Sequence, residues 1–560
     1  QAIALKPDYP EAHSNLGNTL QELGRLEEAI FKYVQVLTLK PDYTDAYVNL
    51  GLALRNYRFR SSERTLYPIL SNLLKTGNFT RPMNVAQGIL SLLKHDPLIE
   101  DLLTEKNTVR DLNEVTIAIE NLNKIPPLYV LMRICPLNDL QLEGLFVSIR
   151  KTILIHLDEI ELSPVFVSFL STLTLHCFTN EYVYFESDEE IQLVNKLGAE
   201  IAQAILLEEQ PRLIDVMCLA IYRPLYRYDW CEKLEVLDQL PEVKSRLIDQ
   251  PLFERVIAKD MRVLKSISDE TSEKVRAQYE ENPYPRWIKL CIHIKNKSIA
   301  ENCDEIDLQL HSENIRDVSS PAILVAGCGT GQHSIETASS FSDCQVTAVD
   351  LSLSSLAYAQ RKTNELGISN VDYMHADILD LGHLDRAFDI IESAGVLHHM
   401  DDPMGGWKVL VDLLKPGGLM KIGLYSELAR GSIAHAREEI GSLGVGTSEA
   451  EIRKYRQSLV ESHNEQHKQL TKFRDFFSLS TLRDLIFHVQ EHRFTLPQIQ
   501  DCLDELGLNF CGFESKDIVS QFRKFHGDGS DIYDLALWHQ LEENSPHTFA
   551  GMYQFWCQKS

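Results

Sequence analysis

The chain has 560 residues, too many for one hydrophobic core, so we expect about two to four domains. Acidic residues outnumber basic ones by 81 to 55, and the formal net charge of −26 disfavours binding to nucleic acid while it favours the approach of basic peptides. The 11 cysteines include no Cys-x-x-Cys pair, and no apolar run approaches the roughly 18 residues of a membrane span. We therefore expect a protein of the reducing cytoplasm that binds neither metal nor membrane.

The first 60 residues contain a repeat with a period of 34 residues. Identical residues recur at this offset in the pairs Pro7 and Pro41, Asp8 and Asp42, Tyr9 and Tyr43, Ala12 and Ala46, Asn15 and Asn49, Leu16 and Leu50, Gly17 and Gly51, and Leu20 and Leu54. The spacing predicts two facing helices per period, with the contact residues Leu16, Gly17, Leu20, Ala29, Tyr33 and Val36. Gly17 and Ala29 are small where two helix backbones approach closely, and Pro41 ends the second helix.

This pattern resembles the tetratricopeptide repeat, with one full unit over residues 10–43 and a partial unit up to about residue 60. The chain opens inside what reads as the second helix of a unit, so we expect further repeats upstream. The resemblance implies a concave groove that binds peptide segments. A spacer or a dimer contact is the alternative, which leaves a homo-oligomer open.

Residues 61–270 are rich in Leu and Ile at helical spacing and predict an all-α domain whose role the sequence leaves open. Residues 271–320 then read as a linker or as a lid over the cofactor or substrate. Within them, residues 276–287 combine three aromatic residues with two prolines, too many prolines for a helix. The substrate or lid candidates here are Tyr279, Asn282, Tyr284 and Trp287.

From residue 321 the pattern changes to strand, glycine-rich turn, helix and strand, which is one βαβ unit. The turn is Gly327-Cys-Gly-Thr-Gly331, and the second strand ends at Asp350. A side chain at Gly327 or Gly329 would block the close approach of a ligand to the backbone, and Asp350 is placed to accept both ribose hydroxyls of an adenosine. A dinucleotide fingerprint would have its third glycine one position later, at Gln332.

The Gly-x-Gly-x-Gly spacing resembles motif I of class I S-adenosylmethionine-dependent methyltransferases. Three further segments agree with that family in order: residues 370–377 as a third strand, 388–393 as a fourth strand with Gly395-Val-Leu-His-His after it, and 414–422 as a turn into the fifth strand. The resemblance implies a Rossmann-like α/β domain over residues 321–560 that binds S-adenosylmethionine. It assigns the cofactor contacts to Gly327, Cys328, Gly329, Gly331, Asp350, Leu351, Asp377, Ile378, Ser393 and Ala394.

The end of the chain supplies the rest of the predicted sheet. Residues 496–506 predict an amphipathic helix, residues 508–513 a sixth strand, and residues 552–556 a seventh, antiparallel strand. Between the fifth and sixth strands lies a charged, mostly helical insertion, residues 426–494, which we expect to cap the substrate because it follows the carboxyl end of a parallel strand. His488, Glu491 and His492 in this cap are acceptor-site candidates; a solvated helix face is the alternative.

A methyl group on a sulfonium is already electrophilic, so the enzyme needs mainly to align the nucleophile and exclude water. His398, His399 and Glu392 lie nearest the expected methyl position and are the candidate bases, with a structural role as the alternative for the histidines.

The whole chain resembles bacterial tetratricopeptide-repeat methyltransferases. Our first hypothesis is methyl transfer to a protein or peptide docked through the repeats. The second is a small-molecule or lipid-precursor acceptor, with the repeats binding a partner. The third is a scaffold that binds the cofactor without catalysis.

Overall fold

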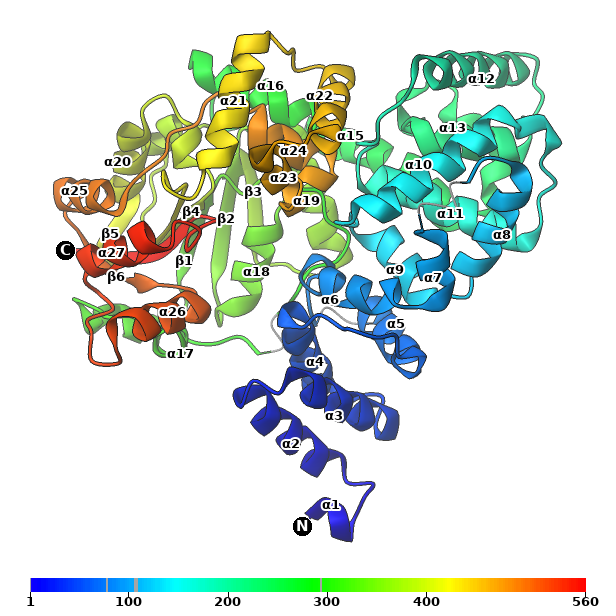
Figure 1. The fold of residues 1–560 in the computed structure, drawn as a ribbon. Helices are drawn as coiled ribbons and strands as arrows, with labels where there is room; N and C mark the ends of the chain where they lie inside the picture. The colour runs from blue at the N-terminus through cyan, green and yellow to red at the C-terminus, as the bar shows by residue number, and fades with distance from the viewer. Residues whose placement is uncertain (1, 77–78, 105–108, 293–294) are drawn as a thin grey trace.

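The structure, a computed structural model, describes residues 2–76, 79–104, 109–292 and 295–560. It divides visibly into a region of helices alone and a region built on a sheet (Figure 1). The N-terminal helices lie at one end of the all-helical region, away from the sheet (Figure 1). The expected order of an all-α part followed by a Rossmann-like α/β part is confirmed.

The repeats form the helices α1 Ala2–Leu5, α2 Pro10–Glu22, α3 Leu26–Leu39 and α4 Thr44–Asn56. Gly17 allows α2 and α3 to approach, because a Cβ added there would lie 2.6 Å from Cε1 of Tyr33. The predicted contact residues are buried with one exception: Leu16 is 36% exposed, so its assignment to the contact face was wrong. Leu50, its partner one period later, is fully buried.

The stack of repeat helices continues into the next region without a break. Helix α6, Pro82–Lys94, packs on α4 so closely that a Cβ on Gly88 would lie 2.3 Å from the carbonyl oxygen of Leu54. The repeats therefore share one core with the helices that follow.

Most helices of this second region begin at an Asp or Ser side chain that accepts a backbone N–H, or at a proline in the first turn, as helix N-termini require. Their bounds are α5 Tyr67–Lys75, α7 Pro97–Leu102, α8 Leu112–Leu122, α9 Pro126–Ile134, α10 Leu140–Ile155, α11 Pro164–Thr179, α12 Asp188–Leu206, α13 Leu213–Tyr222, α14 Pro241–Lys244 and α15 Gln250–Asp260. None of the helices in the described part of the chain combines the length and apolar character that crossing a bilayer requires.

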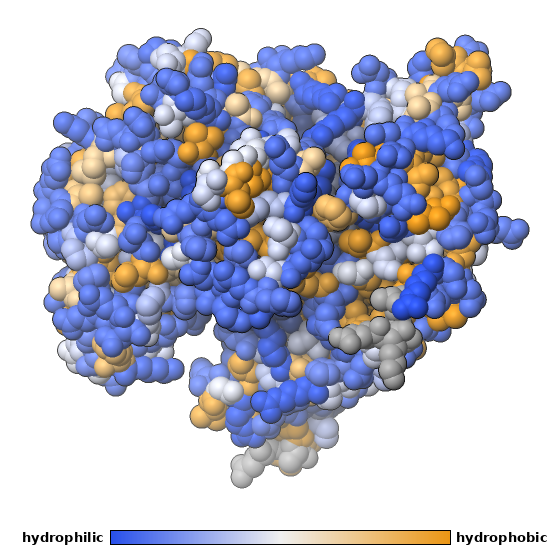
Figure 2. All heavy atoms as spheres, turned by 45° about the horizontal axis from the view of Figure 1, so that its top comes forward, coloured by the Kyte–Doolittle hydropathy of each residue, from blue (hydrophilic) through white to orange (hydrophobic). Residues whose placement is uncertain are grey.

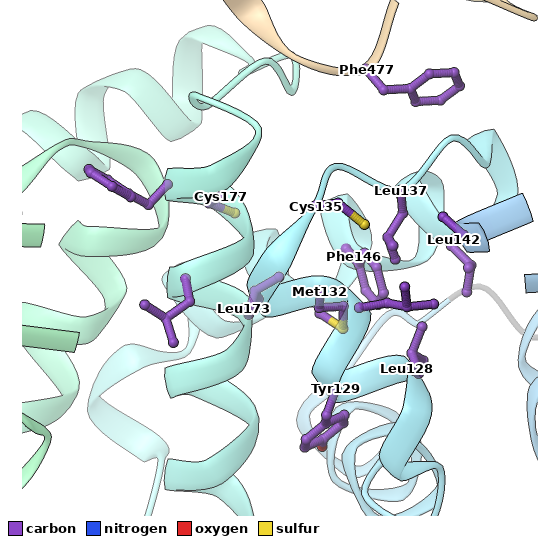
Figure 3. Close-up of a cluster of buried hydrophobic side chains, with 14 of the residues drawn as sticks. Leu128, Tyr129, Met132, Cys135, Leu137, Leu142, Phe146, Leu173, Cys177 and Phe477 are labelled. Carbon is purple, nitrogen blue, oxygen red and sulfur yellow. The ribbon is translucent and has the colours of Figure 1, made fainter. Parts of the chain in front are cut away.

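The cap insertion packs into the core of the all-helical region. Its helices are α21 Gly431–Leu443, α22 Glu449–Glu461, α23 Glu465–Leu470 and α24 Leu479–Ile486. Phe477, between α23 and α24, joins the same buried cluster as Leu137 and Phe146 (Figure 3). Arg456 of α22 binds Glu143 of α10 through two hydrogen bonds of 2.5 and 2.7 Å, and the Arg456 side chain is 1% exposed. The helical region thus holds the cap in place.

The sheet has seven strands in the order β3-β2-β1-β4-β5-β7-β6, parallel except for β7. Their bounds are β1 Ala322–Ala326, β2 Gln345–Asp350, β3 Val371–His375, β4 Phe388–Ala394, β5 Leu414–Leu424, β6 Leu508–Phe513 and β7 Tyr553–Lys559. All seven predicted strands are confirmed, including the antiparallel seventh.

Helices cover both faces of this sheet, as the alternation of β1 shows. Leu324 and Ala326 pack with α20 Pro403–Leu413, α25 Leu496–Leu506 and α27 Leu535–Asn544. Ile323 and Val325 pack with α17 Ile299–Glu305, α18 Gln332–Ser340 and α19 Leu353–Glu365 on the other face. Helix α26, Lys516–His526, packs on β6 and α27. The carboxyl ends of the parallel strands meet at one edge, where ligands bind in such folds.

One predicted element is wrong. Residues 276–281 were expected to be non-helical, but helix α16 spans Glu270–Glu281 and starts at Asp269, whose side chain accepts the N–H of Ser272. The first proline of the segment is Pro283, two residues past the helix end, so its restriction acts on Asn282 alone.

The surface in Figure 2 is mainly hydrophilic, with apolar residues in scattered patches.

Candidate active site

The glycine loop after β1 has backbone angles that side chains disfavour: φ is +77° at Gly327, +51° at Gly329 and +81° at Gly331. A Cβ on Gly329 would lie 2.5 Å from the carbonyl oxygen of Tyr284. A Cβ on Gly327 would lie 2.2 Å from the side chain of Val396. The sequence predicts that these glycines leave room for a ligand. In the structure, the Tyr284 backbone and the Val396 side chain also lie too close to Gly329 and Gly327 to admit a side chain.

Residues 282–287, which we call the strap, lie directly on this loop. The N–H of Thr330 donates to the carbonyl of Tyr284 at 3.3 Å, and the Thr330 hydroxyl donates to the carbonyl of Pro285. Nε1 of Trp287 donates to the carbonyl of Thr330 at 3.1 Å. The strap is therefore fastened to the loop at three points and fixes where the Tyr284 ring stands.

Asp350, at the end of β2, faces the same loop. Its carboxylate accepts the N–H of Gly329 at 2.8 Å and the N–H of Ser352 at 2.9 Å. Burial raises the pKa of Asp350 to about 6, although these N–H groups oppose the shift. A ligand that donates hydrogen bonds or carries positive charge would relieve the desolvation of this carboxylate.

Helix α16 covers the site beside Asp350. The Glu280 carboxylate accepts the N–H groups of Leu353 and Ser354, at 2.6 and 3.1 Å, and so anchors α16 to the first turn of α19. The helix thereby brings Thr271, Val275 and Tyr279 to the site. A lid position for this segment agrees with these contacts.

A cavity of about 460 Å³ joins the glycine loop to the cap. Eight of the ten predicted cofactor contacts line it: Gly327, Cys328, Gly329, Asp350, Leu351, Asp377, Ile378 and Ala394. Gly331 and Ser393 do not. Gly331, the last residue of the loop, packs against α19, because a Cβ there would meet Ala359 at 2.6 Å, and Ser393 is fully buried.

This end of the cavity, the cofactor end, fits an adenosyl sulfonium. Two carboxylates, Asp350 and Asp377, flank the apolar side chains of Leu351 and Ile378, and Asp377 is held by the N–H of Leu379 at 3.0 Å. Two acids beside apolar contacts suit a ribose and an adenine on a positively charged ligand.

The other end of the cavity, which we call the aromatic arm, comprises Tyr279, Tyr284, Tyr425, His399 and Asp484. The Tyr279 and Tyr284 rings stack with their centroids 6.0 Å apart. The Tyr279 hydroxyl donates to Asp484 at 2.6 Å and lies 3.1 Å from Nε2 of His488. Of the predicted lid residues, Tyr279 and Tyr284 therefore stand at the site.

Asn282 and Trp287, the other two lid candidates, do not line the cavity. Oδ1 of Asn282 accepts a hydrogen bond of 2.6 Å from Arg483, and Trp287 packs edge-on against Tyr358. Both hold the strap in position.

The two candidate histidines are buried, and burial together with nearby positive or histidine groups holds the pKa of each well below 6.5. Only His399 lines the cavity; its Nδ1 lies 2.7 Å from the carbonyl oxygen of Gln490. His398 packs against the Tyr425 ring at 3.9 Å between centroids. Both imidazoles are therefore neutral at pH 7, and His399 alone can meet an acceptor.

Glu392, the third candidate base, lies behind the cavity wall. It is 2.8 Å from Nε2 of His333 and accepts a hydrogen bond from Thr337. Burial raises the pKa of Glu392, but the His333 contact outweighs it and the pKa falls to about 2. This environment disfavours Glu392 as a general base.

None of the three cap candidates lines the cavity. The Glu491 side chain is 1% exposed and binds Arg430 at 2.8 Å, and His492 contacts Gln490 at 3.0 Å. His488 is 3% exposed and stands behind His399, with the two rings 3.6 Å apart. The alternative of a solvated helix face is wrong, because α24 ends at Ile486, His488 is buried and the Glu491 side chain is only 1% exposed.

The sequence analysis did not predict several residues that line the cavity: Arg81, Thr271, Val275, Lys421, Tyr425, Asp484 and Glu514. Tyr425 could have been predicted as a cavity residue, because it directly follows β5 at the carboxyl edge of the sheet. Arg81 and Asp484 carried none; they reach the cavity from the helical region and the cap.

Among the residues that the structure describes, two groups of side chains have potential metal ligands within 4.8 Å of one another: His399, Asp484 and His488, and, in the cap, His435, Glu439 and His467. In the first group, Nδ1 of His399 and of His488 both lie 2.7 Å from the carbonyl of Gln490. That the protein needs no metal ion stays a prediction.

A doubly wound sheet with a glycine loop, an acidic end to the second strand and a cavity between them defines a Rossmann-like binding domain for an adenosine-containing ligand. Comparison with known families makes this specific. Residues 323–418 match the methyltransferase domain, residues 18–56 match the TPR repeat and residues 1–31 match the tetratricopeptide repeat. The chain carries tetratricopeptide repeats and a class I methyltransferase domain, whose cofactor is S-adenosylmethionine.

Individual relatives cover only parts of the chain. An uncharacterized protein of Synechococcus sp. is 30% identical over 39% of this chain and 55% of its own length. Ubiquinone biosynthesis O-methyltransferase of Cereibacter sphaeroides is 31% identical over 21% of the chain and 49% of its own length. (S)-coclaurine N-methyltransferase of Papaver somniferum is 31% identical over 20% of the chain and 32% of its own length. The chain thus spans about half or less of these relatives.

Among solved structures, PKMT2 from Rickettsia typhi is similar at 16% identity, with a TM-score of 0.34 over 46% of this chain and 50% of that one. A likeness of this size has no bearing on the acceptor.

Proposed function

We propose that this protein transfers the methyl group of S-adenosylmethionine to a protein or peptide acceptor that docks on the helical repeats. The observation that carries the methyl transfer is the single cavity with two unlike ends: the glycine loop with Asp350 at one, and the aromatic arm at the other. A cofactor at the first end and an acceptor at the second would meet inside one cavity.

When bound, the cofactor supplies a methyl group that needs no further activation. The glycine loop and Asp350 hold its adenosyl part. The strap and α16 line the cavity, where exclusion of water would favour the transfer. His399 and Asp484 are the residues of the aromatic arm that can receive a proton from the acceptor.

Docking on the repeats rests on amide side chains that the first helices present. Nδ2 of Asn49 on α4 donates to Oδ1 of Asn18 on α2 at 3.0 Å, and Asn15 and Asn18 are exposed. Asparagine amides can both donate to and accept from a peptide backbone. The helical region also reaches the cavity itself, where Arg81 binds Glu336 of α18.

A small-molecule acceptor is the second candidate. Two of the relatives above are named for ubiquinone biosynthesis and for coclaurine, and both match a stretch of about a fifth of this chain. The repeats would then bind a partner other than the acceptor.

The test labels a cell lysate with S-adenosylmethionine carrying a radioactive methyl group. We expect a labelled protein band, reduced about tenfold by the triple variant Asn15→Ala, Asn18→Ala and Asn49→Ala, with an unchanged Kd for the cofactor. Glu11→Gln, an exposed change on the same helix, is the control. Label in small molecules alone favours the second candidate, and no label in any product favours the scaffold.

A further inference from the structure

We propose that the aromatic arm recognises an aliphatic primary amine in its ammonium form, so that the reaction is N-methylation of an amine such as a lysine side chain. This inference rests on the proposed function of the same cavity, and it names the class of acceptor. It is carried by three features: the charge left unpaired on the cavity wall, the tyrosine rings around it, and the hydrogen bonds that orient Asp484.

The charged residues of the cavity wall fall into paired and unpaired sets. Arg81 is paired with Glu336, and Lys421 with Glu514 at 2.8 Å. Asp350, Asp377 and Asp484 remain, and in the described ranges of the chain no ion pair involves any of them. The first two belong to the cofactor end. Asp484, 4% exposed, is the carboxylate left for the acceptor.

Two arginines of the cap, Arg430 and Arg437, act electrostatically on Asp484, and both are paired with another carboxylate. Arg430 lies over the Tyr425 ring, 3.6 Å from its centroid, and Glu491 binds its guanidinium at 2.8 and 3.1 Å. Arg437 adds a weaker contact to the same Glu491 carboxylate at 3.9 Å. These arginines therefore compensate Glu491 first and leave Asp484 without a direct counter-charge.

The hydrogen bond on Asp484 comes from a neutral group. Burial, and next the Asp484 charge, hold the pKa of the Tyr279 hydroxyl well above 10, so Tyr279 stays protonated and donates to Asp484 at 2.6 Å. One oxygen of the carboxylate is thereby fixed. A buried carboxylate with one neutral donor is still costly, and a cation beside it removes most of that cost.

Two tyrosine rings stand beside this carboxylate. Tyr279 and Tyr284 both line the cavity and stack at an interplanar angle of 30°. The Tyr425 ring is already covered by Arg430 and His398, which lie 3.6 and 3.9 Å from its centroid. The faces of such rings attract an ammonium group, with a gain that grows when water is excluded. A neutral hydroxyl acceptor would gain little from the rings and would leave Asp484 charged and uncompensated.

The proposed transfer balances in atoms and charge. The bound ammonium first gives one proton to solvent and becomes the neutral amine, whose nitrogen carries the nucleophilic lone pair. The nitrogen lone pair then forms the new N–C bond as the S–C bond breaks, and that electron pair stays on sulfur. The product nitrogen is charged until it loses a second proton to solvent.

Binding of simple probes tests the recognition directly. With the protein saturated with S-adenosylhomocysteine, we expect calorimetry to show binding of n-butylammonium and none of 1-butanol, which has the same chain and no charge. Asp484→Asn should weaken n-butylammonium at least tenfold, and the control Asp501→Asn, at an exposed site on α25, should not. Equal binding of the two probes, or no effect of Asp484→Asn, overturns the inference.

A pair of variants at Tyr284 separates ring recognition from folding. Tyr284→Phe keeps the ring and should keep the n-butylammonium affinity within about twofold, whereas Tyr284→Leu should lose several-fold. Equal losses in both would show that the ring face plays no part. Each variant is compared with wild type for thermal unfolding, so that a folding defect is seen as such.

The position of the label separates this inference from the proposed function. Acid hydrolysis of the labelled protein should yield methylated amino groups, and label released by mild alkali, as from an ester, would overturn the amine assignment while methyl transfer stands. No labelled product, with n-butylammonium binding intact, would overturn the methyl transfer alone. A tenfold weaker cofactor Kd in Asp484→Asn would mean that the carboxylate holds the cofactor's own amino group, which also overturns the inference.

Discussion

The two ends of the cavity are built in different ways. The cofactor end comes mainly from neighbouring segments of one βαβ unit, the loop Gly327 to Gly331 and the strand end at Asp350, with Asp377 one strand further on. The aromatic arm gathers Tyr279 from α16, Tyr425 from the end of β5 and Asp484 from α24. The cofactor end therefore depends on local backbone geometry. The aromatic arm depends on where the helical region positions the cap.

What holds the cap is the helical region. The cap helices share its hydrophobic core, and the Arg456–Glu143 pair joins them across 313 residues of sequence. We therefore expect a change that destabilises the helical region to weaken acceptor binding before it weakens cofactor binding. This gives the domain of residues 61–270 a proposed role: it positions the acceptor end of the active site.

Arg456→Met should produce the largest effect. It leaves Glu143, whose side chain is 9% exposed, as a buried charge without its partner, which costs about 3 to 5 kcal/mol of stability. We expect loss of acceptor methylation and of n-butylammonium binding at temperatures where S-adenosylmethionine still binds, measured by calorimetry on the same sample. The double variant Glu143→Leu, Arg456→Met should recover much of the stability, because no unpaired charge remains. Parallel loss of both ligands in the single variant would contradict the separation of the two ends.

Gly329→Ala should come next and should act on the cofactor end. The new Cβ would meet the backbone oxygen of Tyr284 at 2.5 Å and the φ of +51° is itself unfavourable, so loop and strap must move apart. We expect the cofactor Kd to rise more than 100-fold, which corresponds to about 3 kcal/mol.

Gly367→Ala is the matched control for Gly329→Ala, because its φ is +68° and a Cβ there has nothing within 4 Å. It should cost about 1 kcal/mol of stability and leave the cofactor affinity unchanged. If Gly329→Ala behaves like Gly367→Ala, the strap does not constrain the loop.

The same contrast explains what could be predicted from the sequence. The seven strands, the glycine loop and the acids at two strand ends follow from short-range patterns, and the structure places them as expected. Asp484 and Arg81 could not be predicted, because their approach to the cavity depends on packing between segments hundreds of residues apart. Leu16 and residues 276–281 were misread for a different reason: helical spacing does not tell which face finds a partner, and prolines constrain mainly the residues just before them.

Asp350→Ala should have the smallest effect of the three, and pH gives it a second readout. Loss of the hydrogen bonds to the ribose should weaken S-adenosylmethionine by about 1 to 3 kcal/mol. In the ligand-free protein, burial raises the pKa of Asp350 to about 6, so the carboxylate is present above that pH and protonated below it. A carboxyl group loses both its charge and part of its capacity to accept hydrogen bonds. The cofactor Kd of the wild type should therefore rise as the pH falls through about 6, by at most tenfold per pH unit, whereas the Kd of Asp350→Ala should stay flat between pH 5 and 8.

A variant at Glu280 checks that Asp350 is the titrating group, because the charge of Glu280 also raises the pKa of Asp350. Glu280→Gln should move the pH at which the cofactor Kd changes to a lower value. A transition that persists unchanged in Asp350→Ala would place the titrating group elsewhere in the cavity and would remove the ribose contact from this carboxylate.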